Sequence, residues 1–521
     1  MPRILKVPFH PALFTLYPVL ALYTVNIHEV AIAVMWRPLL ISLAGSILLL
    51  AILRLILRDW LKASLITSFI IFLFYSYGRL YEGLKTTPLA TMNIVRHRYL
   101  AVLFVAILVM GSWLLIKTIR DFKPITGVLN AIAVVLVILP GYQIASYFIN
   151  TSSGEHAASN WIPSTSLISP AQPKEKPDVY YIILDTYARS DRIKAELGYD
   201  NSDLLQQLKA LGFYIATCSR SNYNNTHNSI VSSLNMSYLP ELYAEGAIQG
   251  ISIPDIWMLI KPSAVRRNFE ALGYKIVAFD SGFEWTRIDD ADLYLQRGGD
   301  AYGLKFVSPF EQMLMDTTVL KILSDYQSKA NLEKYLEGTH PQANFIGQEE
   351  FILDQLPKVA EISDPTFTFA HIDIPHPPYV FSPDGYLTDP GYWSVPVKGA
   401  VDEEHFRSGY IYAVEYIDAR ILEIVREILS KSSTPPIIII QGDHGYGEGD
   451  NFPILNAYFL PKVQPGTLYP TLSPVNSFRL IFNQYFGGQY TLLPDKSFLV
   501  TDVTTPISET LQDCISTSSQ Q

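Results

Sequence analysis

Residues 437–445 read Ile-Ile-Ile-Ile-Gln-Gly-Asp-His-Gly, a short β-branched run that leads directly into a polar turn. Four consecutive isoleucines are typical of a strand that is buried on both faces of a parallel sheet. The glycines at both ends of the turn, Gly442 and Gly445, permit a sharp bend, which lets Asp443 and His444 face one point. This segment therefore predicts an α/β fold with a polar site at the end of a strand.

Three other runs share this pattern, and each is followed by a polar residue. They are Val179–Leu184 before Asp185, Lys275–Phe279 before Asp280, and Thr366–Ala370 before His371. The runs alternate with helical patterns such as Asn201–Leu211 and Tyr410–Leu429, which indicates a mostly parallel central sheet. Because ligands bind at the carboxyl ends of the strands in such sheets, we expect the polar residues to gather at one edge.

The chemistry of these residues suits a divalent cation, although each has a simpler reading. Carboxylate oxygens and imidazole nitrogens, as in Asp443 and His444, are ligands that such cations prefer. An ordinary turn with a capping aspartate explains the pair equally well, and Asp185 alone reads as a cap or turn residue. His371 reads as a packed core histidine. His227 reads either as a partner behind the site or as a solvated loop residue.

A polar loop, residues 221–225, precedes Thr226 and leads into a predicted helix. A hydroxyl at a helix start lies where the free N–H groups and the helix dipole favour negative charge. With a cation beside it, such a hydroxyl can act as a nucleophile toward phosphorus or sulfur. Taken alone, Thr226 reads as a plain N-cap.

The chain of 521 residues divides into two unlike parts. Residues 1–150 hold 13 Lys and Arg against 4 Asp and Glu, whereas the remainder holds 26 against 45. Five apolar stretches in the basic part are each close to the roughly 20 residues that cross a bilayer. They are Phe9–Ile27, Leu39–Leu57, Ala63–Tyr77, Tyr99–Ile116 and Ile125–Phe148. The pattern predicts a multi-pass protein of the plasma membrane, and the acidic remainder excludes nucleic acid as a partner.

The loop charges favour an N-terminus inside the cell, because eight basic residues lie on the predicted inner loops and five on the outer ones. Five spans then place everything after Asn150 outside the cytoplasm. We predict a transmembrane region at 1–149, a Ser/Pro-rich linker at 150–177 and one large α/β domain at 178–521. Cys218 and Cys514 can pair in an oxidising compartment or remain two buried thiols.

The polar residues, taken in order, resemble the alkaline phosphatase/sulfatase superfamily over about residues 178–459. The matching positions are Asp185, Thr226, His376 within Pro-His-Pro-Pro-Tyr, and the pair Asp443 and His444. Together with the five apolar stretches, the chain looks like the lipoteichoic-acid synthase group of phosphoglycerol transferases and their sulfatase-like relatives. The resemblance implies that residues 178–521 form a sulfatase-like catalytic domain, an α/β/α sandwich with a mostly parallel central sheet.

The resemblance also implies a role for each matching residue. Thr226 is the nucleophile, and Asp185, Asp443 and His444 join its oxygen around one divalent cation. Manganese is the expected metal, with zinc, magnesium or calcium as alternatives. His376 contacts the substrate or the leaving group, and the reaction passes through a phospho-threonine. The expected donor is an anionic membrane phospholipid, and the expected acceptor is an envelope glycan or a lipid.

The sequence departs from its relatives in ways that narrow the function. Residues 218–221, Cys-Ser-Arg-Ser, lack the Cys/Ser-x-Pro-x-Arg motif of classical sulfatases, so we do not expect sulfate-ester hydrolysis of that type. His444 is the last of the ten histidines, which favours one metal over two. The alternatives to a head-group transferase are a phosphatase or phosphodiesterase acting on soluble esters and a non-catalytic, envelope-binding relative.

Overall fold

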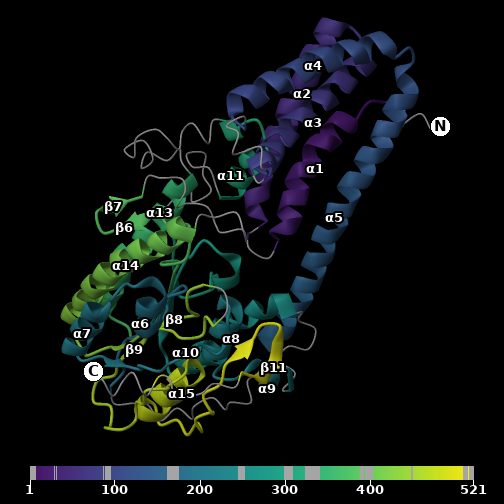
Figure 1. The fold of residues 1–521 in the computed structure, drawn as a ribbon. Coiled ribbons are helices and arrows are strands. Elements are labelled where there is room, and N and C mark those ends of the chain that lie inside the picture. The colour runs from purple at the N-terminus through teal and green to yellow at the C-terminus, as the bar shows by residue number, and fades with distance from the viewer. Residues whose placement is uncertain are drawn as a thin grey trace. The chain divides into compact units, whose positions relative to one another are not determined.

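The structure, a computed structural model, describes most of the chain. The described residues are 7–27, 30, 32–85, 87, 95–160, 175–244, 253–297, 309–322, 341–387, 392, 403–447, 450–507 and 514. The chain forms two compact units (Figure 1), one of Met1–Ile149 with Gly299–Asn344 and the other of Asn150–Gly298 with Phe345–Gln521. The division predicted from the sequence, at 149 and 178, remains a prediction, and it did not anticipate that residues 299–344 belong with the first unit.

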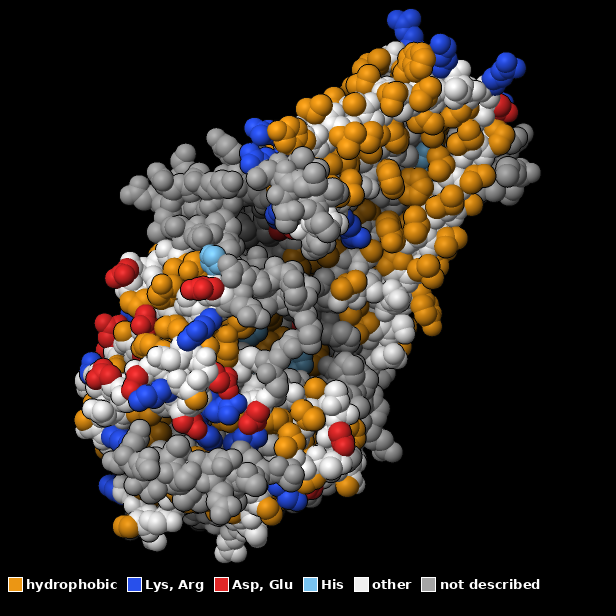
Figure 2. Space-filling view, in the orientation of Figure 1, with side chains coloured by type: hydrophobic (Ala, Val, Ile, Leu, Met, Phe, Trp, Pro, Cys, Tyr) orange, Lys and Arg blue, Asp and Glu red, His pale blue; other side chains and the backbone are white. Residues whose placement is uncertain are grey.

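The first unit is built on apolar helices, as expected. They are α1 (His10–Val25), α2 (Ala33–Leu57), α3 (Trp60–Lys85), α4 (His97–Thr118) and α5 (Phe122–Asn160). Four of the described helices are long and apolar enough to cross a membrane, whereas α1 has only 16 residues. The count of five spans therefore stays a prediction. Hydrophobic side chains cover the surface of these helices (Figure 2), which suits contact with lipid.

A short helix from much later in the chain, α11 (Pro309–Asp316), packs against α1, α2 and α3. Arg37 of α2 forms an ion pair with Glu311. The backbone approaches α3 so closely at Gly78 that an added Cβ would collide with the carbonyl oxygen of Asp316. Glycine is therefore required at this crossing, and α11 belongs to the helical unit.

The second unit contains a seven-stranded sheet in the order β2-β9-β8-β1-β5-β3-β4. Its strands are β1 (Val179–Leu184), β2 (Tyr214–Ile215), β3 (Lys275–Phe279), β4 (Leu293–Leu295), β5 (Thr366–Ile372), β8 (Ile437–Gly442) and β9 (Asn456–Phe459). The five strands from β8 to β4 pair in parallel, and β9 and β2 add antiparallel pairs at one edge. The prediction of a mostly parallel sheet is confirmed.

Helices surround the sheet, and two small hairpins accompany it. The helices are α6 (Ser190–Arg192), η3 (Ile193–Leu197), α7 (Ser202–Ala210), α8 (Thr226–Asn235), α9 (Leu239–Ala244), η4 (Ile253–Leu259), α10 (Ala264–Ala271), η5 (Glu284–Thr286), α13 (Pro341–Gln355), η8 (Leu356–Glu361), α14 (Glu403–Lys431) and α15 (Pro474–Tyr485). The hairpins pair β6 (Phe381–Ser382) with β7 (Gly385–Tyr386), and β10 (Phe498–Leu499) with β11 (Asp502–Pro506).

Alternate side chains of the fully buried strand β1 enter two different hydrophobic cores. Tyr181 and Ile183 pack in the core that includes α8, α10 and α15. Tyr180 and Ile182 pack on the other face, in the core that includes α7 and α14. Because a strand turns successive side chains to opposite faces, this arrangement makes the domain a sandwich of helices, sheet and helices.

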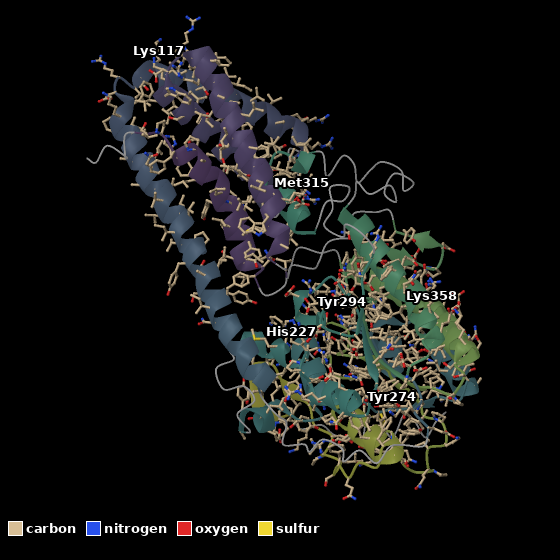
Figure 3. The ribbon with its side chains drawn as sticks, turned by 180° about the vertical axis from the view of Figure 1, so that it is seen from behind. Lys117, His227, Tyr274, Tyr294, Met315 and Lys358 are labelled. Atoms are coloured by element: carbon tan, nitrogen blue, oxygen red, sulfur yellow. A yellow bond between two sulfur atoms is a disulfide. The ribbon has the colours of Figure 1, made fainter. Side chains whose placement is uncertain are left out.

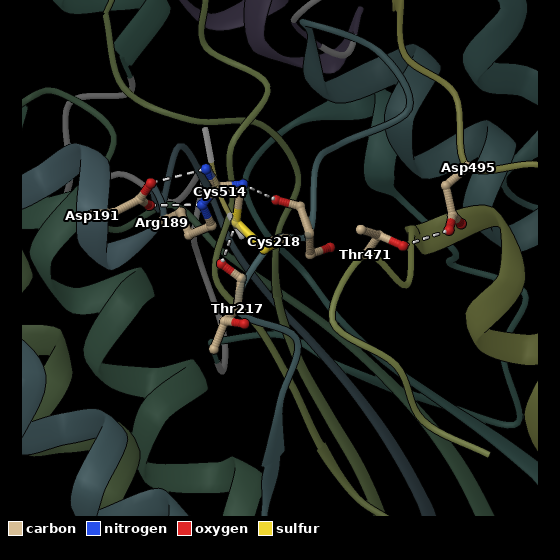
Figure 4. Close-up of a disulfide and its surroundings, with 8 residues drawn as sticks. Arg189, Asp191, Thr217, Cys218, Thr471, Asp495 and Cys514 are labelled. Atoms are coloured by element: carbon tan, nitrogen blue, oxygen red, sulfur yellow. Dashed lines mark hydrogen bonds and ion pairs between the residues drawn. A yellow bond between two sulfur atoms is a disulfide. The ribbon is translucent and has the colours of Figure 1, made fainter. Parts of the chain in front are cut away.

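The two cysteines are paired, which the sequence left open. Cys218, in the loop between β2 and α8, forms a disulfide with Cys514 across 296 positions of the chain (Figure 4). The backbone beside Cys218 is held as well, because the Arg189 guanidinium donates a hydrogen bond to the carbonyl oxygen of Ser219 over 3.1 Å. The disulfide thus fixes the last part of the chain to the loop that leads toward Thr226.

Replacing Cys218 with serine is expected to lower the free energy of unfolding by about 2–4 kcal/mol, because the bridge restricts the unfolded chain. Denaturant unfolding of the full-length protein in detergent measures this change. Cys514→Ser is the matched variant and should lose as much. Addition of a reductant should lower the stability of the wild type only, and a wild type that is insensitive to reductant contradicts the prediction.

Candidate metal centre

The ends of three neighbouring parallel strands bring two aspartates and a histidine together. Strand β1 lies between β5 and β8, and Leu184 is in register with Ile372 and Gly442. Asp185 and Asp443 therefore leave adjacent strands at the same level, and His371 lies within β5. Ligand atoms of Asp185, His371 and Asp443 all lie within 4.8 Å of one another.

The three side chains fit a divalent cation. All are buried, with exposed fractions of 2% or less. Asp185 Oδ1, Asp443 Oδ2 and His371 Nδ1 have no hydrogen-bond partner among the described residues. Leaving buried polar atoms unpaired costs free energy, and carboxylate and imidazole donors suit a divalent cation. The sequence analysis read His371 as a packed core histidine. It is fully buried, but its ring lies within reach of Asp185 and Asp443.

The electrostatics of the two aspartates depend on their neighbours. Burial raises the pKa of Asp443, and the nearby Asp185 raises it further. Burial also acts to raise the pKa of Asp185, but the adjacent His376, His371 and His444 outweigh it, so this pKa lies below its ordinary value. Asp185 is therefore the group that most readily carries negative charge at this edge of the sheet.

Two further buried carboxylates lie beside Asp185, and the sequence analysis missed both. Asp373 follows β5, and its backbone N–H donates to Glu349 Oε2 over 2.9 Å. Burial raises the pKa of Glu349 to about 8, although the bond from Asp373 opposes this shift. Burial, Asp185 and Glu349 raise the pKa of Asp373. Asp373 could have been predicted from the sequence, because it follows a strand as Asp185 does. Glu349 could not, because nothing in the sequence around it on α13 indicates that it lies near the site.

His444 lies at the border of the group. Its Nε2 is 3.7 Å from Asp443 Oδ2, and its Nδ1 is 3.0 Å from the carbonyl oxygen of Gly445. Burial acts to lower the pKa of His444, but Asp443 and Asp185 outweigh it, so the pKa is raised. The role of His444 as a metal ligand stays a prediction.

Thr226 is the first residue of α8, as predicted, and the contacts of its neighbours lead to the site. On one side, the His227 ring (labelled in Figure 3) packs 4.6 Å from Trp285, which lies 5.3 Å from the His371 ring. On the other side, Asn451 Nδ2 donates to the carbonyl oxygen of Asn224 over 3.3 Å and lies 3.4 Å from His444 Nδ1. The start of α8 is therefore connected by side-chain contacts to both His371 and His444, and through them to the group of Asp185, His371 and Asp443.

The other polar residues from the sequence analysis have distinct places. His376 is half-buried, and its Nδ1 lies 3.7 Å from Asp373 Oδ1 and 2.6 Å from the carbonyl oxygen of Pro377. Its role toward a substrate stays a prediction. Asp280 accepts a hydrogen bond from the Gly282 N–H over 3.0 Å and so stabilises the turn after β3.

The turn after Asp185 is held by helix α14. The Tyr410 hydroxyl donates to the carbonyl oxygen of Thr186 over 2.9 Å and accepts from the Ala188 N–H over 3.0 Å. The Tyr187 hydroxyl donates to the buried Asp418. Thr186 itself has a φ of 62°, a left-handed conformation that these surrounding contacts must maintain. The position of Asp185 therefore depends on α14.

Comparisons with known proteins give likenesses of structure only. No family model matches the sequence, and no curated protein matches it. The C-terminal periplasmic domain of EptC from Escherichia coli, solved with zinc, is 10% identical and covers 67% of this chain and 96% of its own, with a TM-score of 0.42. Lipooligosaccharide phosphoethanolamine transferase A from Neisseria meningitidis is 14% identical and covers 90% and 94%, with a TM-score of 0.38. A 2-O GAG sulfatase is 14% identical and covers 61% and 72%, with a TM-score of 0.38.

The sequence resemblance named sulfatases and phosphoglycerol transferases, whereas these structures are of phosphoethanolamine transferases and a sulfatase. At such low identities and TM-scores, the activity and the substrate of these proteins cannot be transferred to this chain. The group of Asp185, His371 and Asp443 does not rest on these likenesses, because it is seen in the structure of this chain itself.

Replacing His371 with alanine is expected to weaken binding of Mn²⁺ or Zn²⁺ by at least about tenfold, because the cation loses its imidazole donor. Metal content after dialysis against a metal buffer, measured by mass spectrometry, checks this. His405→Ala is the control, since His405 lies on α14 against Tyr392. Equal metal content in the two variants contradicts the assignment of His371.

Replacing Asp418 with asparagine is expected to stabilise the protein at alkaline pH. Burial raises the pKa of Asp418 to about 8, despite the bond from Tyr187. A folded pKa above the unfolded value of about 3.9 stabilises the fold at low pH, and that stability is lost as the pH rises toward 8. The variant should therefore unfold at a higher temperature than the wild type at pH 9 and at a similar one at pH 4.

Thermal unfolding at both pH values checks this prediction. Asp354→Asn is the control for the loss of one carboxylate, because Asp354 is exposed on α13 and pairs with Arg420 at 2.7 Å. If the unfolding temperature of Asp418→Asn depends on pH in the same way as that of the control, the assignment of a raised pKa to Asp418 is wrong.

Proposed function

We propose that this chain is a membrane-anchored, metal-dependent enzyme that transfers a phosphorus-containing head group from an anionic membrane phospholipid. The observation that carries this proposal is the buried group of Asp185, His371 and Asp443, which is connected through packed side chains to the helix that begins at Thr226. A buried set of cation ligands near a nucleophile at a helix start suits phosphoryl transfer better than binding alone.

Thr226 is the proposed nucleophile, and its place favours that role. It begins a helix of ten residues, where backbone N–H groups face outward and favour an anionic phosphoryl group. The Thr226 oxygen forms a bond to phosphorus and gives its proton to water, and the bond from phosphorus to the diacylglycerol oxygen breaks. Diacylglycerol leaves, and the head group stays on Thr226 as a phospho-threonine diester. The alcohol oxygen of an envelope glycan or lipid then forms a bond to phosphorus and releases its proton, the bond from phosphorus to Thr226 breaks, and the Thr226 oxygen takes up a proton again.

His376 is the proposed proton donor to the departing lipid oxygen. Its ring is half-buried and therefore accessible, and its Nδ1 lies 3.7 Å from Asp373 Oδ1, which orients the ring. A divalent cation held by Asp185, His371, Asp443 and His444 would supply positive charge against the charge that develops on the phosphoryl oxygens. Manganese is our first choice, with zinc, magnesium or calcium as alternatives.

We place the α/β unit outside the cytoplasm, with the apolar helices in the plasma membrane. The disulfide between Cys218 and Cys514 supports this placement, because such bonds persist in oxidising compartments and are rare in the cytosol. A catalytic domain tethered to apolar helices can act on lipid head groups at the membrane surface.

Incubation of the full-length protein with Mn²⁺ and vesicles of the anionic phosphatidylglycerol, followed by acid quenching, is expected to leave a phosphoryl adduct on the Thr226 peptide. Peptide mass spectrometry measures the adduct and identifies the donor. Thr226→Ala should abolish the adduct and lower turnover by at least about 1,000-fold, since the nucleophile is gone. Thr226→Ser keeps a hydroxyl and should retain the adduct.

Three results would contradict the transferase. Absence of any adduct, with turnover unchanged in Thr226→Ala, removes Thr226 from the reaction. Phosphate release from soluble esters at the same rate without lipid indicates a phosphatase or phosphodiesterase instead. If the protein binds Mn²⁺ but converts neither lipid nor soluble ester, it is a binding protein of the envelope.

A further inference from the structure

The helical unit contains an apolar cavity of about 660 Å³ between α1, α3, α4 and α5. Its walls are mainly aromatic and aliphatic, with Phe14, Phe69, Leu115, Leu129 and Ile132 among them. Such a volume is typical of a site for a small molecule. The cavity lies wholly within residues 14–136, so it belongs to the first unit and is distinct from the metal centre.

The cavity is long enough for a lipid chain. Its lining on α3 runs from Leu65 to Arg79, fourteen positions that span about 21 Å at the rise of an α-helix. One leaflet of a bilayer core is about 15 Å thick, half of the whole. An extended acyl chain from a single leaflet therefore fits along this wall.

One cation lies at the end of this wall. Among the described residues that line the cavity, Arg79 alone is charged, and its side chain is exposed six residues before α3 ends at Lys85. Within the part of the chain that the structure describes, no carboxylate pairs with Arg79, whereas Lys85 is paired with Glu82 at 3.3 Å. Because guanidinium groups bind phosphate through parallel hydrogen bonds, Arg79 can hold a phosphate at the end of the cavity.

The hydroxyl groups beside Arg79 already have partners. The Tyr75 hydroxyl donates to Ser42 Oγ over 3.0 Å, and Ser76 Oγ donates to the carbonyl oxygen of Phe72 over 2.6 Å. The lining therefore offers one available cation at one end and little other polar chemistry. A peptide segment would leave its own backbone groups unpaired against such walls, so the occupant must be apolar along its length.

We infer that this cavity binds one acyl chain of an anionic phospholipid, whose phosphate is held by Arg79. The apolar walls select the chain, and the single cation selects the charge of the head group. This site lies in a different unit from the metal centre, and the inference does not depend on the proposed reaction.

Phosphatidylglycerol with a photoactivatable group near the end of one acyl chain tests this inference in vesicles that contain the full-length protein. After irradiation, we expect adducts on the cavity wall of α5, at Leu129, Ile132 or Leu136, in peptide mass spectra. Arg79→Gln should lower this labelling at least fivefold. Arg98→Gln is the matched control, because Arg98 is exposed in the first turn of α4 and is not part of the cavity lining.

Phosphatidylcholine with the same chain should label the cavity less, because the choline cation already neutralises its phosphate, and Arg79→Gln should lower that labelling by a smaller factor. A second variant, Leu129→Trp, fills the cavity and should remove the labelling of Ile132 and Leu136. If this variant fails to fold, the comparison of Arg79→Gln with Arg98→Gln still decides the test.

Three results would overturn the inference. The first is equal labelling in Arg79→Gln and Arg98→Gln. The second is labelling confined to outward-facing residues such as Leu40 and Ile47 of α2, which indicates only the general lipid layer around the helices. The third is competition by free glycerol phosphate as effective as that by unlabelled phosphatidylglycerol, which indicates a soluble anion instead of a lipid.

Discussion

The burial of several carboxylates at one end of a parallel sheet is the constraint on which the α/β unit depends. Asp185 and Asp443 leave adjacent strands at the same level, with Asp373 and Glu349 close behind them. Ionised carboxylates that are removed from water repel one another, and each loses its hydration. Such a cluster is stable only with protons or cations nearby, and the His371 imidazole lies within the same group.

The surrounding structure keeps this cluster in place. Helix α14 holds the turn after Asp185 through Tyr410 and Asp418. Trp285 separates the rings of His227 and His371, and Asn451 joins the loop before α8 to His444. All of these contacts except that of Asn451 with His444 join residues distant in the chain, so the geometry of the site depends on the packing of the whole domain rather than on any one loop.

The helical unit is stabilised and exposed to its surroundings in a different way from the α/β unit. Its outer surface is apolar, and its specific contacts include the ion pair of Arg37 with Glu311 and the close approach at Gly78. Where the helices leave a cavity, a single arginine at its end makes that cavity selective for charge. A membrane region of this kind can recognise a lipid by the same two properties, length and charge, that set its position in the bilayer.

Local sequence patterns determined the apolar helices, the buried strands and the start of α8 at Thr226, because each depends on side chains only a few positions apart. The strand-end position of Asp185 and Asp443 followed in the same way. Tertiary structure alone decided that His371 joins them, that Glu349 lies behind them, and that Cys218 pairs with Cys514. It also decided that α11 packs on the membrane helices. These contacts join residues tens to hundreds of positions apart, and a periodic pattern records which face of an element is buried but not which distant residue it meets.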